Sequence, residues 1–121
     1  MYTGGERSKL TDKVIAAFDN ARAGELLIYV SAAVLWEIAI LNSLGHVKLK
    51  DRFDRWAGGV LSIEGFKHIP LTIESIHLGV GYGMQTDPFD RIIVATAVEL
   101  DLPLITKDAA IAESKLVEVY W

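Results

Sequence analysis

Short apolar segments alternate with longer helical patterns along most of this 121-residue chain. The apolar segments are residues 26–30, 68–71, 102–106 and 116–120. Short runs of this kind are typical of strands buried in a parallel sheet. The helical patterns cover residues 9–23, 31–44, 48–61, 73–80, 88–100 and 108–114. Because parallel strands need a crossover, usually a helix, the alternation predicts an α/β fold with helices on both faces of a short, mainly parallel sheet.

Capping residues mark the ends of several of these helices. Ser8 and Ser31 precede the first two helices and can accept hydrogen bonds from their first turns. Gly24 and Gly45 follow the same helices and suit the left-handed conformation that often ends a helix. Thr72 stands before the pattern that begins at residue 73 and is expected to cap it.

Residues 79–86 are expected to form a flexible loop. Glycines at positions 79, 81 and 83 give three glycines in five residues, which carries a high backbone entropy cost in a helix. This glycine pattern neither follows a strand nor carries the lysine of a phosphate-binding loop. It therefore indicates a connection rather than a ligand site.

The composition limits what a chain with this fold could be. With 51% hydrophobic residues it can build one core, so we expect a single domain over residues 1–121, with residues 1–7 as a disordered or extended tail. No apolar run approaches the roughly 20 residues that span a bilayer, and no signal-peptide pattern is present, which favours a cytoplasmic protein without a membrane partner. The absence of cysteine excludes thiolate metal sites, and a net charge of −4 means that nucleic-acid binding would need local basic groups or bridging cations.

Two carboxylates accompany strongly apolar helical patterns. Glu37 is the only charged residue between positions 31 and 44, where a buried charge needs a cation or hydrogen bonds. A glutamate of this kind, taken alone, more often emerges at the helix rim or pairs with arginine. Asp90 begins an apolar helix and could cap it, bind a metal, or do both. Asp87, followed by Pro88, fits the N-cap of that helix.

A third carboxylate, Asp108, follows the apolar segment 102–106. That position is the carboxyl end of a strand, where open α/β sheets bind their ligands, although a surface turn is an equal alternative. Glu37 and Asp90 are expected near the same edge, and three carboxylates repel each other unless a cation neutralises them. Without cysteine or paired histidines the set matches Mg²⁺ or Mn²⁺, and such a cation fits phosphodiester hydrolysis.

Polar and basic residues next to these acids are candidates for contacts with RNA phosphates. They are Arg91, Thr106 and Lys107. The densest basic stretch, residues 48–55, is more often a solvated helix face than a binding surface. Apolar faces on the helices 9–23 and 31–44 would be a natural place for self-association if they are exposed.

Three ordered blocks of the sequence resemble the PIN-domain ribonucleases, and among them the VapC-type toxins of bacterial toxin-antitoxin pairs. The blocks are Val30–Ile40, Asp87–Ala95 and Leu104–Asp108. The resemblance implies a PIN-like three-layer α/β/α fold and a Mg²⁺-dependent endoribonuclease, usually a homodimer, that is blocked by a cognate antitoxin. By position, Glu37, Asp90 and Asp108 match the second, third and fourth acidic residues of that family. Asp87 and Thr106 are neighbours within the same motifs.

The chain departs from this family pattern at its start. The family has a first apolar strand that ends in an aspartate and lies in the middle of the sheet, and residues 1–7 contain neither feature. A gene start placed too far downstream, a degenerate homologue, and a strand supplied by a neighbouring protomer are three explanations. Each predicts weak binding of Mg²⁺ or Mn²⁺, because affinity for hard cations follows the number of charged ligands. The alternative function is a catalytically inactive PIN-like module for binding or dimerisation.

Overall fold

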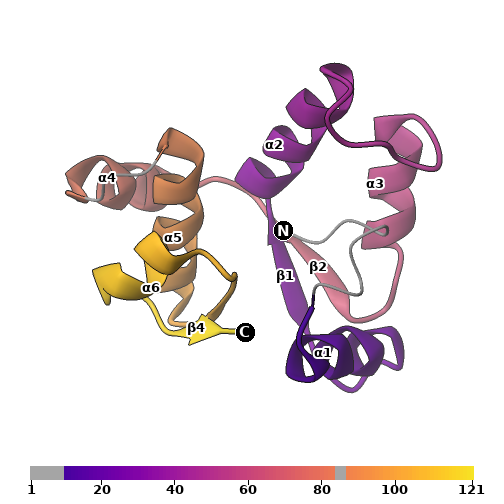
Figure 1. Ribbon diagram of the computed structural model, residues 1–121, viewed down its shortest axis with the longest axis horizontal. Coiled ribbons are helices and arrows are strands. Elements are labelled where there is room, and N and C mark those ends of the chain that lie inside the picture. Colours follow the sequence, from indigo (N-terminus) through magenta and orange to yellow (C-terminus); the bar gives the residue numbers. More distant parts are fainter. Residues whose placement is uncertain (1–9, 84–86) are drawn as a thin grey trace. The chain divides into compact units, whose positions relative to one another are not determined.

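The computed structural model of the protein describes residues 10–83 and 87–121. Its elements are α1 (Asp12–Arg22), β1 (Ile28–Ser31), α2 (Ala32–Ser43), α3 (Phe53–Leu61), β2 (Phe66–Ile69), α4 (Ile73–Gly81), α5 (Pro88–Leu100), β3 (Leu104–Ile105), α6 (Ala109–Ser114) and β4 (Val119–Tyr120) (Figure 1). The chain divides between Ile69 and Pro70 into two compact units, called here the N-terminal and C-terminal units. The tail expected at residues 1–7 and the cap expected at Ser8 lie outside the described residues.

Each unit contains one pair of parallel strands. In the N-terminal unit β1 pairs with β2, with Ile28 opposite Phe66. In the C-terminal unit β3 pairs with β4, with Leu104 opposite Val119. The expected α/β fold with short parallel sheets is confirmed, and the described strands form these two pairs.

The core of the N-terminal unit lies between α1 and the strand pair. Four residues of α1 are buried at helical spacing, namely Val14, Ala17, Phe18 and Ala21. The Phe18 and Phe66 rings stack with centroids 6.2 Å apart and planes 9° from parallel. The apolar face of α1 is therefore used inside this unit, and the expectation that it serves self-association is wrong.

Gly65 brings the start of β2 against the end of α1. It is buried, and a Cβ atom at this position would overlap the backbone of Ala21. The Gly65 carbonyl accepts a hydrogen bond from the Ile28 N–H at 2.7 Å, which begins the pairing of β1 with β2. Only glycine lets the chain pass this close to the helix while it enters the sheet.

Local capping determines both ends of α2. The Ser31 hydroxyl accepts a hydrogen bond from the Val34 N–H at 3.2 Å, and Gly45 follows the helix with a φ of 77°. Both were expected from the sequence. In α1 only the end was predicted correctly. Gly24 follows the helix with a φ of 77°, but the N-cap is Thr11 and not Ser8, since the Thr11 side chain accepts from the Val14 N–H at 3.3 Å.

The start of α3 lies five residues later than its apolar pattern predicts, at Phe53 instead of Lys48. The N-cap position is Arg52, and its side chain makes no capping hydrogen bond. The Arg52 guanidinium instead donates two hydrogen bonds of 2.8 Å to Asp54, which lowers the pKa of that carboxyl group.

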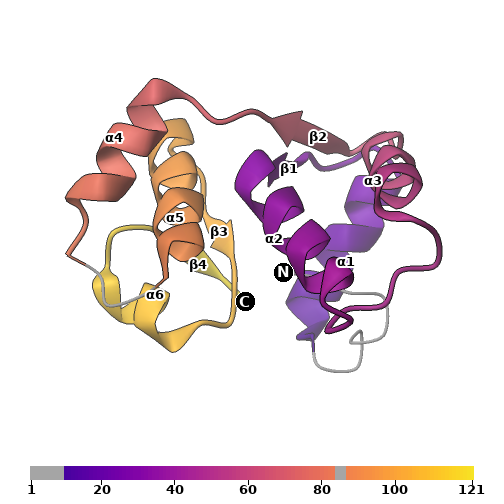
Figure 2. The same cartoon turned by 90° about the horizontal axis from the view of Figure 1, so that it is seen from above.

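The C-terminal unit is built on an antiparallel hairpin of α4 and α5, which lie side by side in Figure 2. Thr72 caps α4 as expected: its hydroxyl accepts from the Ser75 N–H at 3.0 Å, and the Ser75 hydroxyl accepts from the Thr72 N–H at 3.2 Å. The Thr72 hydroxyl also donates to the Glu99 carboxylate at 2.7 Å. The start of α4 is thereby tied to the last turn of α5.

The flexible loop expected from Gly79 onward is partly wrong, because α4 continues through Gly81. Gly79 is buried where α4 crosses α5, and a Cβ atom there would meet the Arg91 carbonyl oxygen at 3.4 Å. The gain from this close packing, together with hydrogen bonds from Arg91, offsets the entropy cost of glycine in a helix. Tyr82 and Gly83 follow the helix, and residues 84–86 lie outside the described part of the chain.

Candidate metal centre

Asp87 is the N-cap of α5. Its Oδ1 accepts a hydrogen bond from the Asp90 N–H at 2.8 Å, and Pro88 occupies the first helical position. This agrees with the capping role expected from the sequence. The carboxylate is exposed and lies at the positive end of the helix dipole, which stabilises its charge.

Asp90 lies in the first turn of α5 and is half-buried. Asp87 and Asp90 each offer a carboxylate oxygen, and these two atoms lie within 4.8 Å of each other. Two carboxylates this close repel each other, and the helix dipole offsets part of the repulsion. A cation between them would neutralise the pair.

Glu37 belongs to the N-terminal unit, in the second turn of α2. It is half-buried, and it lies between Trp36, whose side chain is 59% exposed, and Ile38, which is 4% exposed. The residue is thus on the boundary between the exposed and the buried face of the helix. The sequence alternative that places this glutamate at the helix rim agrees with its position.

Asp108 is the N-cap of α6 and follows β3 by three residues. Its Oδ1 accepts from the Ile111 N–H at 3.0 Å, and its own N–H donates to the Thr106 hydroxyl at 3.1 Å. Within the described part of the C-terminal unit, Asp108 does not join Asp87 and Asp90 in one close group of carboxylates. The sequence allowed a turn aspartate here, but the cap was missed, although a six-residue helix follows it.

The three candidate phosphate contacts lie in different environments. Lys107 is exposed, and Thr106 is half-buried and uses its hydroxyl oxygen to accept from Asp108. Arg91 is already engaged, because its guanidinium donates to the carbonyl oxygens of Gly79, Val80 and Tyr82. Sequence reasoning missed this contact, because nothing in the local pattern links Arg91 to residues nine to twelve positions earlier.

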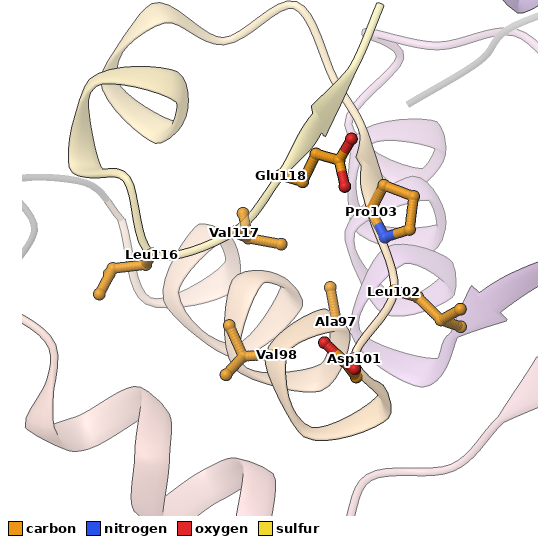
Figure 3. A pocket seen from close by; sticks show the side chains of 8 residues that line it. All are labelled: Ala97, Val98, Asp101, Leu102, Pro103, Leu116, Val117 and Glu118. Carbon is orange, nitrogen blue, oxygen red and sulfur yellow. The ribbon is translucent and has the colours of Figure 1, made fainter.

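A hollow of about 140 Å³ lies at the other end of α5. Figure 3 shows its lining side chains, which come from the last turn of α5 and from the segments that lead into β3 and β4. Asp101 and Glu118 are its acidic groups. Asp101 lies eleven positions after Asp90, or roughly 16 Å along a helix at 1.5 Å per residue, so the hollow is separate from the Asp87–Asp90 pair.

The donor set at the start of α5 fits a hard divalent cation. Asp87 and Asp90 offer carboxylate oxygens, and the sequence has no cysteine that would favour a softer metal. Two carboxylates with remaining positions filled by water are a usual arrangement for Mg²⁺. The same oxygens suit Mn²⁺.

None of the helices in the described ranges is long and apolar enough to cross a bilayer. Comparison with curated proteins gave no match to this chain, and comparison with solved structures gave none either. A family model described as the PIN domain matches residues 3–115, which is nearly the whole chain and includes the start of α5 and the end of β3. The protein belongs to the PIN domain family.

Proposed function

We propose that this protein is a Mg²⁺- or Mn²⁺-dependent endoribonuclease of the toxin-antitoxin type. PIN domains form a nuclease family that generally binds divalent metals, and PIN nucleases act on RNA. The observation that carries the proposal is the pair of carboxylates at the start of α5, Asp87 and Asp90, within a chain of this family. The pair has oxygen ligands suited to such a cation, and the helix dipole stabilises its charge.

Glu37, Asp90 and Asp108 are proposed as the catalytic carboxylates, with Asp87 as an additional metal ligand. When bound, the cation would neutralise the scissile phosphate and lower the pKa of a water molecule that attacks it. The role of the carboxylates is to hold the cation and to orient that water. Lys107 and Thr106 are proposed to contact the phosphates on either side of the cleaved bond.

The proposal is tested by RNA cleavage with Asp90→Asn and with Asp101→Asn as the matched control. Each variant removes one carboxylate charge, Asp90→Asn from the first turn of α5 and Asp101→Asn from its C-cap, and asparagine tolerates the left-handed conformation of Asp101. Asp90→Asn should abolish cleavage without unfolding the protein, and Asp101→Asn should leave it unchanged. If Asp90→Asn cleaves RNA as fast as Asp101→Asn and the wild type, Asp90 has no role in the mechanism.

The cleavage chemistry provides a second test. Attack by water does not use the ribose 2′-hydroxyl, so RNA with a 2′-O-methyl group at the cleaved nucleotide should still be cut. Cleavage should stop with EDTA and return with Mn²⁺. Cleavage that resists EDTA and leaves a 2′,3′-cyclic phosphate would point to a contaminating ribonuclease. A protein that binds Mn²⁺ and RNA but cuts neither substrate would be the inactive binding module.

The toxin assignment and the homodimer are parts of the same proposal. Expression of the chain in a bacterial host should arrest growth, and Asp90→Asn should relieve the arrest. A cognate antitoxin should suppress both the growth arrest and the cleavage of RNA in vitro. If Asp90→Asn still arrests growth, the toxicity does not depend on nuclease activity.

A further inference from the structure

The side chain of Arg91 closes the end of α4. Its Nε donates to the Gly79 carbonyl oxygen at 3.1 Å. Its Nη2 donates to the carbonyl oxygens of Val80 at 2.7 Å and Tyr82 at 2.9 Å. The last carbonyls of a helix have no partner within the helix and carry a partial negative charge, so a guanidinium there makes charge-assisted hydrogen bonds.

The backbone of Arg91 also packs against α4, next to Gly79. A Cβ atom on Gly79 would lie 3.4 Å from the Arg91 carbonyl oxygen and 3.6 Å from the Cα of Ile92. The Arg91 backbone thus packs against Gly79 while its side chain donates to the carbonyl oxygens of Gly79, Val80 and Tyr82. The end of α4 is held against the first turn of α5 by both packing and hydrogen bonds.

Among the residues that the structure describes, a hydrogen bond also attaches α4 to α5 at the other end of the hairpin. At the far end the Thr72 hydroxyl donates to the Glu99 carboxylate at 2.7 Å. At the near end Arg91 directly follows Asp90, one of the two carboxylates of the candidate metal centre. Only the near attachment lies in the turn of α5 that presents these carboxylates.

We propose that Arg91 is a positioning residue for the metal centre and not a contact for RNA phosphate. The proposal rests on the nuclease function proposed above. Three of the five guanidinium N–H groups already bind carbonyl oxygens, and their fork geometry fixes the end of α4 on the turn that carries Asp87 and Asp90. Loss of this attachment lets that turn move, and the carboxylates then hold the cation in a less constant geometry.

A lysine cannot replace Arg91 in this role, because one ammonium group on a flexible stem does not reproduce the planar fork. Arg91→Lys and Arg91→Ala should therefore lower kcat by a similar factor of about ten or more, since small misplacement of catalytic groups is costly. KM for RNA should change little, and both variants should need more Mn²⁺ for half-maximal activity. A phosphate contact would behave differently, because lysine would restore much of the loss.

Salt dependence separates the two roles further. Removal of one phosphate contact to single-stranded RNA reduces the slope of log affinity against log salt by about 0.7. Arg91→Ala should leave the slope of log KM unchanged, and Lys107→Ala should reduce it, because Lys107 is exposed and proposed to contact phosphate. A reduced slope for Arg91→Ala, with rescue by Arg91→Lys, would overturn the proposal.

Amide hydrogen exchange tests the attachment without relying on activity. The Tyr82 N–H donates to the Gly79 carbonyl at the end of α4, so it should exchange faster in both Arg91 variants. Glu99→Ala is the matched control, because it removes the far attachment of the same hairpin. It should speed exchange near Ser75 while kcat stays at the wild-type value. Unchanged exchange at Tyr82 in Arg91→Ala would show that the guanidinium does not hold α4.

Direct titration with Mn²⁺ keeps the test valid if the wild-type protein cuts no RNA. In that case the absence of cleavage rejects the nuclease function. Tighter binding of Mn²⁺ to the wild type than to Arg91→Ala would still support the positioning role of Arg91. Equal affinity of the two proteins, or a wild type that binds no Mn²⁺, would overturn the positioning role. The failure of each proposal therefore gives a different result.

Discussion

Asp108 has an observed structural role as the N-cap of α6 and a proposed chemical role at the metal centre. Its Oδ1 caps α6 by accepting from the Ile111 N–H, and the same carboxylate is a proposed metal ligand. Asparagine is as good an N-cap as aspartate but has no charge, and alanine can do neither. The two substitutions therefore separate the roles.

We expect Asp108→Ala to lower the free energy of unfolding by about 1 kcal/mol, the usual cost of a lost N-cap, and Asp108→Asn to leave it nearly unchanged. Urea denaturation followed by circular dichroism measures both values. If Asp108 is a ligand, both variants should lose Mn²⁺ affinity to a similar extent. Asp108→Asn with wild-type affinity would leave Asp108 as a cap alone.

At the scale of elements, glycine has opposite effects in α3 and at the start of β2. Gly58 lies inside α3, and a Cβ atom there would meet nothing within 4 Å. At Gly65 a Cβ atom would overlap the Ala21 backbone, which cannot move without shifting α1. Replacing glycine with alanine therefore increases helix propensity at Gly58 and disrupts packing at Gly65.

Gly58→Ala should raise the free energy of unfolding by roughly 0.5–1 kcal/mol, because alanine loses less backbone entropy in a helix. Gly65→Ala should lower it by about 1–3 kcal/mol or more, since the inserted atom forces backbone shifts. Thermal or urea unfolding compares the two variants with the wild type. If Gly65→Ala leaves the free energy of unfolding unchanged, the end of α1 can shift at little energetic cost.

At the scale of the whole molecule, α4 presents an apolar stripe to solvent. Ile73 is 82% exposed, Ile76 is 48% exposed and Val80 is 74% exposed, and their spacing places them on one face of the helix. Exposed apolar residues on one helix face support the proposed homodimer, because self-association would remove them from water.

The double variant Ile73→Lys, Val80→Lys should shift the protein from dimer to monomer in sedimentation velocity runs. Charges on both copies of the face would repel each other and would need desolvation at the interface. Highly exposed positions contribute little to folding, so the monomer should keep its circular dichroism spectrum. A double variant that sediments as a wild-type dimer would place the interface elsewhere.

The sequence alone determined the helix ends that depend on neighbouring residues. Ser31 with Gly45, Thr72, and Asp87 with Pro88 mark helix limits that the structure confirms. These signals are local, because a capping side chain bonds to an N–H group only two or three residues away. The family could likewise be recognised without coordinates, from the order of the acidic motifs along the sequence.

Tertiary structure decided what depends on partners distant in sequence. β3 and β4 are shorter than their apolar runs, whereas β1 and β2 are displaced from theirs, to residues 28–31 and 66–69 instead of 26–30 and 68–71. A strand extends only where its partner supplies hydrogen bonds, so its limits depend on the pairing. Gly79 and Gly81 lie in α4, where Arg91 supplies hydrogen bonds to the helix end, and Gly65 is needed because α1 lies against it. Such contacts bring together residues far apart along the chain, so no local pattern shows that α4 continues through its glycines or that Gly65 is indispensable.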